Sequence, residues 1–130
     1  MPSAKEAAVA SLSAVRAKDK AAWLALFADD AVVEDPVGPS PFDPEGKGHR
    51  GKTGISAFYD NVISHNEEFD FTIHHAFECA GESASFATFK IKTRGVSFEM
   101  PIIIVHKVNA DGKLTSLRAF WEFPSGGLGG

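Results

Sequence analysis

The sequence predicts an α+β fold, in which helices come first and one curved, mostly antiparallel sheet follows. Up to about residue 65, apolar residues recur at helical spacing. After Glu68 they alternate with polar residues, as in a half-buried strand. A chain of 130 residues is long enough for one domain with one core. Because the helices and strands are segregated, we expect the sheet to wrap around the N-terminal helices over a cavity.

Composition excludes several classes of protein. The net charge is −4 and the basic residues are scattered, so a nucleic-acid partner is not expected. No apolar run approaches the roughly 20 residues that span a bilayer, so no membrane partner is expected either. The single cysteine cannot form an internal disulfide, and the N-terminus lacks an apolar signal segment. We therefore expect a cytoplasmic protein, with one domain over residues 1–124 and a flexible Gly-rich tail over 125–130.

The first helix is predicted from Ala4 to Ala17. Its apolar residues follow helical spacing: Ala8, Leu12 and Val15. Ser3 precedes the helix and Glu6 follows three residues later, a spacing typical of a capping box.

A second, short helix is predicted after Asp19, which can act as its N-cap. Its apolar face would consist of Trp23, Leu26 and Phe27. The helix would end before Asp29, and a strand would start at Val32. Residues 36–51 contain four prolines and several glycines, so we expect a loop that forms a partial lid.

A third helix is predicted with Thr53 as its cap and His65 near its end. One side of it carries Ile55, Phe58, Tyr59, Val62 and Ile63.

Four strands are then expected. The first alternates, with Phe69, Phe71, Ile73, His75 and Phe77 on one face. A strand over residues 83–93 follows, and Arg94-Gly95 predicts a hairpin turn to a strand over 96–108. The turn Asn109-Ala110-Asp111-Gly112 leads to the last strand, over 113–123.

Three segments carry a resemblance to a known family: LFADDAVVEDPVG, ISAFYDNVI and VNADGKLTSLRAFWEF. Together they resemble the ketosteroid isomerase branch of the nuclear transport factor 2-like fold, over nearly the whole chain. The resemblance implies a conical α+β barrel, a deep apolar pocket and a homodimer. It also implies an enzyme that moves a steroid double bond into conjugation with the 3-ketone. No cofactor motif is visible, so none is expected.

Asp35 matches the family's catalytic base. Moving a double bond next to a ketone requires a base beside the carbon that loses its proton, and donors facing the ketone oxygen. The following Pro36 holds Asp35 extended. Alone, an acid before a proline is more often a turn residue, but within this motif we favour the base. Glu34 would point to the opposite face of the strand.

The family's two oxyanion donors are absent. The position of its first-helix tyrosine falls near Ser11, and that of its inner-strand aspartic acid falls on Ile104. Tyr59 is the leading replacement, with Ser11 second and the indole N–H of Trp121 third. Each also has a structural interpretation: Tyr59 as core, Ser11 as a helix contact and Trp121 as cavity wall.

His106 shares an alternating strand face with Met100, Ile102 and Ile104, so it would face the cavity if Ile104 does. An acid–base pairing of Asp35 with His106 or His75, as in the fold's dehydratases, is then conceivable, but a structural histidine is favoured. Ligand spacing for a metal is lacking, so no metal site is expected.

Inward-facing apolar side chains would accommodate a flat, steroid-like ligand. The candidates are Val15, Trp23, Phe27, Tyr59, Phe71, Phe89, Ile102, Ile104, Leu117 and Trp121. On the outer face, Ile103, Val105 and Phe120 would form an apolar patch that a homodimer covers.

Two alternatives to the isomerase stay open. One is a protein that binds steroids or other hydrophobic molecules with little turnover. The other is a dehydratase, cyclase or epoxide hydrolase on the same fold. The epoxide hydrolase is disfavoured because Arg118 would alternate outward if Trp121 faces inward.

Overall fold

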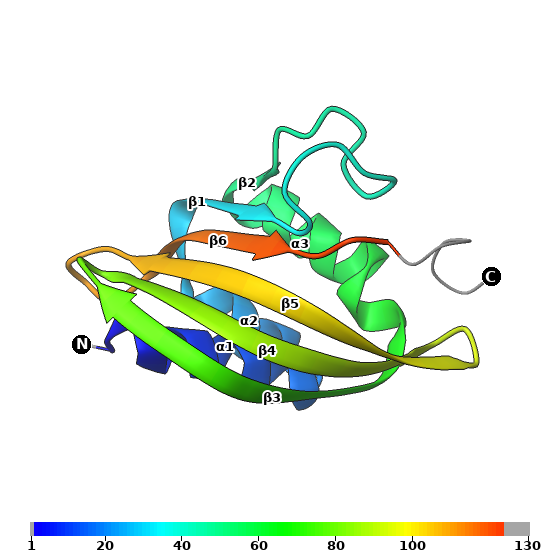
Figure 1. The fold of residues 1–130 in the computed structure, drawn as a ribbon. Coiled ribbons are helices and arrows are strands. Elements are labelled where there is room, and N and C mark those ends of the chain that lie inside the picture. Colours follow the sequence, from blue (N-terminus) through cyan, green and yellow to red (C-terminus); the bar gives the residue numbers. More distant parts are fainter. Residues whose placement is uncertain (1, 124–130) are drawn as a thin grey trace.

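The computed structural model describes residues 2–123, and the tail expected over 125–130 lies outside them. Figure 1 shows the order of the elements. The helices are α1 (Ala4–Arg16), α2 (Lys20–Ala25), α3 (Gly51–Asn61) and the short 3-10 helix η1 (Ile63–His65). The strands are β1 (Phe27–Glu34), β2 (His49–Arg50), β3 (Asn66–Cys79), β4 (Glu82–Thr93), β5 (Val96–Val108) and β6 (Leu114–Phe120).

The strands form one curved six-stranded sheet in the order β2-β1-β6-β5-β4-β3. Neighbouring strands pair antiparallel, except β1 and β6, which run parallel. The predicted α+β class and mostly antiparallel sheet are confirmed. The two edge strands are β2, which has only two residues, and β3. They do not pair with each other, so the sheet is not closed. The barrel implied by the resemblance is therefore open.

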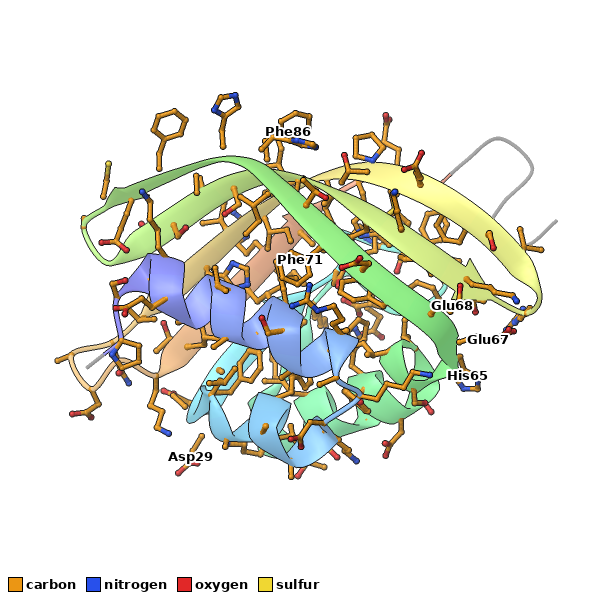
Figure 2. The ribbon with its side chains drawn as sticks, turned by 90° about the horizontal axis from the view of Figure 1, so that it is seen from below. Asp29, His65, Glu67, Glu68, Phe71 and Phe86 are labelled. Atoms are coloured by element: carbon orange, nitrogen blue, oxygen red, sulfur yellow. The ribbon has the colours of Figure 1, made fainter. Side chains whose placement is uncertain are left out.

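The helices cover one face of the sheet and leave the other face bare (Figure 1). Figure 2 shows the two faces: Phe71 lies on the helix-covered inner side, and Phe86 lies on the outer side. The core is between the inner face and the helices, where Trp23, Ile55 and Leu114 are fully buried. No helix within residues 2–123 combines the length and apolar character needed to cross a membrane.

The start of α1 is as predicted. The backbone N–H of Glu6 donates to Ser3 Oγ at 3.1 Å, and the N–H of Ser3 donates to Glu6 Oε1 at 2.9 Å. These two bonds form the capping box and satisfy donors that a helix start leaves free.

The predicted end of the second helix is wrong. Asp19 caps α2 as expected, but Phe27 belongs to β1, where it pairs with Leu114 of β6. The register between β1 and β6 shifts between Phe27 and Val32, which accommodates the exposed Asp29 and Asp30 inside the strand. Aspartate is rare in strands, so Asp29 and Asp30 in the sequence indicate the end of a helix and not the middle of a strand.

The start of the third helix was also predicted wrongly. Helix α3 begins at Gly51, directly after β2, and Thr53 lies inside it without acting as its cap. Gly51 has φ +70°, a conformation that glycine adopts readily and that lets the chain turn from strand to helix within one residue.

A bulge in β3 changes which residues face inward. Ile73 pairs with Ala87 and His75 pairs with Phe86, so one residue of β3 has no partner on β4. The phase of the strand therefore shifts after Ile73: Ala76 is partly buried, whereas His75 and Phe77 are exposed. The prediction that both share the inner face with Phe71 is wrong.

The loop between β1 and β2 is held down at both ends. Val37 N–H donates to the carbonyl of Ala119 at 2.9 Å, and Gly48 N–H donates to Asp43 Oδ2 at 2.7 Å. Gly48 has φ +84°, and a Cβ there would lie 2.6 Å from Val32 Cγ1. The tip of the loop brings Phe42 to the cavity described next.

Candidate active site

A cavity of about 410 Å³ lies between the inner face of the sheet, the helices and the loop after β1. This volume is in the range typical of small-molecule sites. Its inner walls are mostly apolar and include Leu12, Val15, Val33, Phe58, Phe89, Met100, Ile102, Ile104, Leu117 and Ala119. Polar and ionisable side chains at the wall include Ser11, Asp35, Asn61, His65, Asn66, Thr93, Arg94 and His106.

Asp35 lies directly after β1, at the point where this strand runs beside β6. Its Oδ1 accepts a hydrogen bond of 2.7 Å from the indole Nε1–H of Trp121. Within residues 2–123 the Asp35 carboxylate makes no other hydrogen bond. Its Oδ2 is therefore free to contact a ligand. Burial raises the pKa of Asp35, and the bond from Trp121 acts in the opposite direction. The carboxyl is therefore protonated more readily than one in water, which suits a group that accepts a proton and returns it.

Ser11 lies on α1 and is 1% exposed. Its Oγ accepts a hydrogen bond of 3.1 Å from Trp23 Nε1–H. A hydroxyl that accepts one bond keeps its own hydrogen for another. Ser11 can therefore donate into the cavity, with Trp23 fixing its oxygen.

His106 lies on β5 and is fully buried. It pairs with Ser83 on β4 and Leu117 on β6. Neither ring nitrogen has a hydrogen-bond partner within the described residues, and the same is true of the Ser83 and Ser85 hydroxyl oxygens. Burial lowers the pKa of His106 to about 4. The imidazole is therefore neutral at physiological pH and carries one N–H donor and one acceptor.

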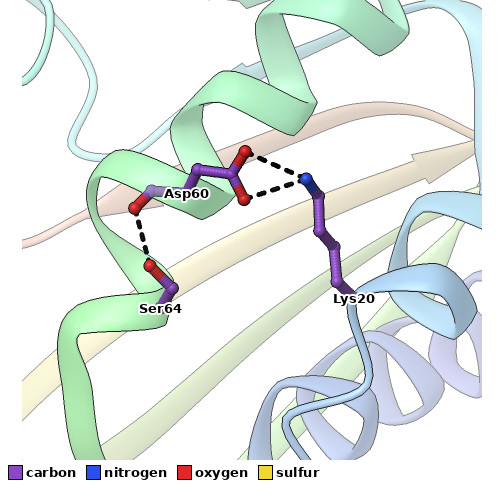
Figure 3. Close-up of polar contacts among 3 residues, drawn as sticks. All are labelled: Lys20, Asp60 and Ser64. Atoms are coloured by element: carbon purple, nitrogen blue, oxygen red, sulfur yellow. Dashed lines mark hydrogen bonds and ion pairs between the residues drawn. The ribbon is translucent and has the colours of Figure 1, made fainter.

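Tyr59 does not line this cavity. Its side chain is buried against Trp23 and lines a separate small pocket that also includes Lys20 and Ser64. Lys20 donates to both oxygens of Asp60 at 2.8 and 3.0 Å, and Ser64 Oγ donates to the Asp60 carbonyl at 2.6 Å (Figure 3). Burial raises the pKa of Tyr59, and the nearby Asp19 carboxylate adds to this effect.

The structure brings most of the predicted site residues together. Those at the cavity wall are Ser11, Trp23, Asp35, Phe89, Ile104, His106, Leu117 and Trp121. Phe27 is not among them, because it lies in β1 beneath Trp23, with ring centroids 4.8 Å apart. The inward direction of Met100, Ile102, Ile104 and His106, predicted from strand alternation, is confirmed.

Several wall residues were missed in the sequence. Pro41 and Phe42 come from the loop, and Phe123 from the segment after β6. Phe123 packs at a tilt against Trp121 and Phe42, with ring centroids 4.6 and 5.8 Å apart. An aromatic residue inside a loop rich in proline and glycine was the available signal. Within residues 2–123, no group of three or more His, Cys, Asp and Glu side chains is placed to bind a metal ion.

Comparisons with known proteins agree with this geometry. The family model described as a SnoaL-like domain matches residues 8–117. A steroid Δ-isomerase from Nocardioides simplex is 34% identical over 119 residues, which cover 90% of this chain and 88% of that protein.

Two solved structures are similar along nearly their whole length. A Δ5-3-ketosteroid isomerase from Mycobacterium sp. has a TM-score of 0.85 and 33% identity, covering 93% of this chain and 95% of its own. A Mycobacterium tuberculosis protein in complex with estradiol-17β-hemisuccinate has a TM-score of 0.85 and 34% identity, with the same coverage, 93% and 95%.

We predict that Asp35→Asn stabilises the fold at neutral pH. Because the folded pKa of Asp35 is raised, the folded state binds a proton that the unfolded state has already lost, and stability falls as pH rises through that window. Asparagine keeps the shape and the acceptor for Trp121 without the charge. Urea unfolding at pH 7 should give a higher midpoint for Asp35→Asn than for wild type. The exposed Asp30→Asn is the control, and a lower midpoint for Asp35→Asn would contradict the expectation.

We predict that His106→Leu makes stability less sensitive to acid. With a folded pKa of about 4 against an ordinary 6.5, wild type loses stability as pH falls from 6.5 to 4. This histidine contributes about 3 kcal/mol to that loss, at 1.36 kcal/mol per pH unit. Unfolding free energies at pH 7, 5.5 and 4 should therefore decline less in His106→Leu. The exposed His75→Leu serves as the control, and equal declines in wild type and His106→Leu would refute the prediction.

Proposed function

The chain belongs to the SnoaL-like domain family, and from this membership and the cavity we propose that it is a Δ5-3-ketosteroid isomerase-like enzyme. It would move a steroid double bond into conjugation with the 3-ketone by intramolecular proton transfer. The observation that carries the proposal is one carboxylate, Asp35, held by Trp121 in a largely apolar cavity.

The proposed reaction needs one base that acts twice. Asp35 takes a proton from the carbon between the ketone and the double bond. The electron pair of the C–H bond forms a new C–C double bond, and the carbonyl π pair moves to the oxygen, giving a dienolate. Asp35 then returns the proton to the far carbon of the original double bond. Atoms and charge balance without a cofactor.

Two features of the site support Asp35 in this role. Trp121 occupies Oδ1, which leaves Oδ2 for the substrate. Burial raises the pKa of the carboxyl, so the protonated form needed in the second step is less unfavourable than in water.

The three donors considered for the ketone oxygen are not equally supported. The indole N–H of Trp121 already donates to Asp35. Ser11 lines the cavity and keeps a free hydroxyl hydrogen. Tyr59 lines the separate pocket beside Lys20, so a packing role fits it better than a donor role. We therefore retain Ser11 as a donor and assign Tyr59 to the core.

A steroid-like substrate is supported by the wall. Aromatic and aliphatic side chains dominate it, including Trp121, Trp23, Phe89, Ile104 and Leu117. Similar proteins are a steroid isomerase and a protein solved with an estradiol conjugate. A cytoplasmic location remains a prediction from the sequence.

Binding without efficient turnover is the second candidate. It is favoured by the replacement of the family's expected tyrosine and aspartic acid by Ser11 and Ile104. An epoxide hydrolase is less well supported, because Arg118 pairs with Glu34 at 3.3 Å and is exposed. A dehydratase pairing through His75 is also disfavoured, because this histidine is exposed beyond the β3 bulge.

We further propose that the outer face of the sheet forms a homodimer. Phe86, Ile103 and Phe120 occupy one row across β4, β5 and β6, and they are 43%, 48% and 40% exposed. Exposed apolar rows of this kind mark interaction surfaces, and a second copy would bury each row against an identical one.

Light scattering after gel filtration should report a dimer for wild type and a monomer for Ile103→Lys, because an unpaired lysine ammonium in that row is costly to bury. Val9→Lys, at an equally exposed apolar position on α1, should remain dimeric. A monomeric wild type at micromolar concentration would exclude the proposed interface.

The activity is tested with 5-androstene-3,17-dione, whose conjugated product absorbs in the ultraviolet. Wild type should convert it, and Asp35→Asn should be slower on the order of 10²–10⁴-fold, as is typical when a general base is lost. Asp30→Asn, at an exposed position within β1, should retain the wild-type rate. Steroid binding without any Asp35-dependent rate would favour the binding protein.

A further inference from the structure

His106 is the most unusual polar group in the cavity wall. Its side chain is 0% exposed, and both ring nitrogens lack partners within the described residues. Buried polar groups are nearly always hydrogen-bonded, since leaving one unpaired costs about 1–3 kcal/mol. An unpaired imidazole that lines a ligand cavity indicates that the ligand supplies the partner.

The surroundings of His106 keep it neutral. Its neighbours across the sheet are Ser83 and Leu117, neither of which is charged. The other ionisable side chains at the cavity wall are Asp35, His65 and Arg94; the last two are exposed, and the Asp35 carboxylate bonds to Trp121. The imidazole is thus neutral, carries one N–H, and belongs to a residue that lines the cavity.

The register of the sheet places His106 two strands away from Asp35 along the cavity wall. Val33, Leu117 and His106 form one row over β1, β6 and β5, and Asp35 lies two residues beyond Val33. Two strand spacings are roughly 10 Å, and two residues along a strand about 7 Å. These spacings separate the two backbone positions by roughly 12 Å, so one ligand can contact both side chains.

We propose that His106, as a neutral imidazole, donates its N–H to the substrate's ketone oxygen and stabilises the dienolate oxygen that forms when Asp35 removes the proton. This inference rests on the proposed isomerase function and supplies the donor that the sequence lacks. No proton leaves His106: the C–H proton goes to Asp35, and the imidazole strengthens an existing hydrogen bond as negative charge develops. Ser11, on the helix that covers the sheet, is the second donor.

The kinetic test compares His106→Leu with His106→Gln. Leucine preserves the volume without a donor, whereas the glutamine amide restores an N–H at similar reach. The kcat of His106→Leu should fall on the order of 10²–10³-fold, as for the loss of one oxyanion donor, and His106→Gln should recover much of it. His75→Leu, on the exposed side of the sheet, should retain wild-type kcat. Unchanged kcat in His106→Leu would overturn the proposal.

A binding test separates this inference from the proposed function. Estradiol carries a phenol whose oxygen can stand in for the dienolate oxygen, and its binding needs no turnover. Its affinity should fall about two- to tenfold in His106→Leu, which is the net contribution of one hydrogen bond, and remain near wild type in His106→Gln.

The same complex can be observed without a variant. In wild type labelled with ¹⁵N-histidine, the His106 N–H proton resonance should move downfield when estradiol binds. The resonance is measured on wild type, so the donor role can be tested even if His106→Leu fails to fold. An unmoved resonance together with equal affinities would refute the donor role, even if Asp35-dependent isomerisation is found. A moved resonance without Asp35-dependent turnover would keep the donor and reject the isomerase.

Discussion

The site depends on the hydrogen bond from Trp121 to Asp35 across the one parallel strand pair. Because β1 and β6 run in the same direction, both leave the sheet at the same end of the cavity, and the carboxylate and the indole meet at 2.7 Å. This bond fixes one carboxylate oxygen and leaves the other for chemistry. It is charge-assisted, so it also offsets part of the cost of placing an anion among apolar side chains.

The cavity concentrates unfavourable groups that the rest of the fold must support. A buried carboxylate and a neutral histidine without partners among the described residues lie at its wall, and both destabilise the folded chain. The close-packed core around Trp23, Ile55 and Leu114 holds them in place. Departures from good packing and full hydrogen bonding are expected where a ligand binds, because the ligand completes the set.

The sequence predicted what local patterns determine. The capping box of α1, the hairpin at Arg94-Gly95 and the inward face of Met100, Ile102, Ile104 and His106 all follow from short-range spacing. It failed where contacts distant in sequence decide. The bulge that turns His75 outward depends on pairing with β4, and Phe27 belongs to a strand because it pairs with β6. Which pocket Tyr59 lines depends on how α2 packs against α3. The importance of His106 was hidden for the same reason, since only the packed sheet and helices reveal that its nitrogens have no partner.

The most direct test of the account follows the transferred hydrogen itself. 5-Androstene-3,17-dione deuterated at the carbon between the ketone and the double bond is converted by wild type, and the product is analysed by mass spectrometry and NMR. A single carboxylate shielded in an apolar cavity predicts that a substantial share of the product carries deuterium at the far carbon of the original double bond. A product without deuterium at that far carbon, where the added hydrogen has come from water, or no product at all, would contradict a shuttle by Asp35.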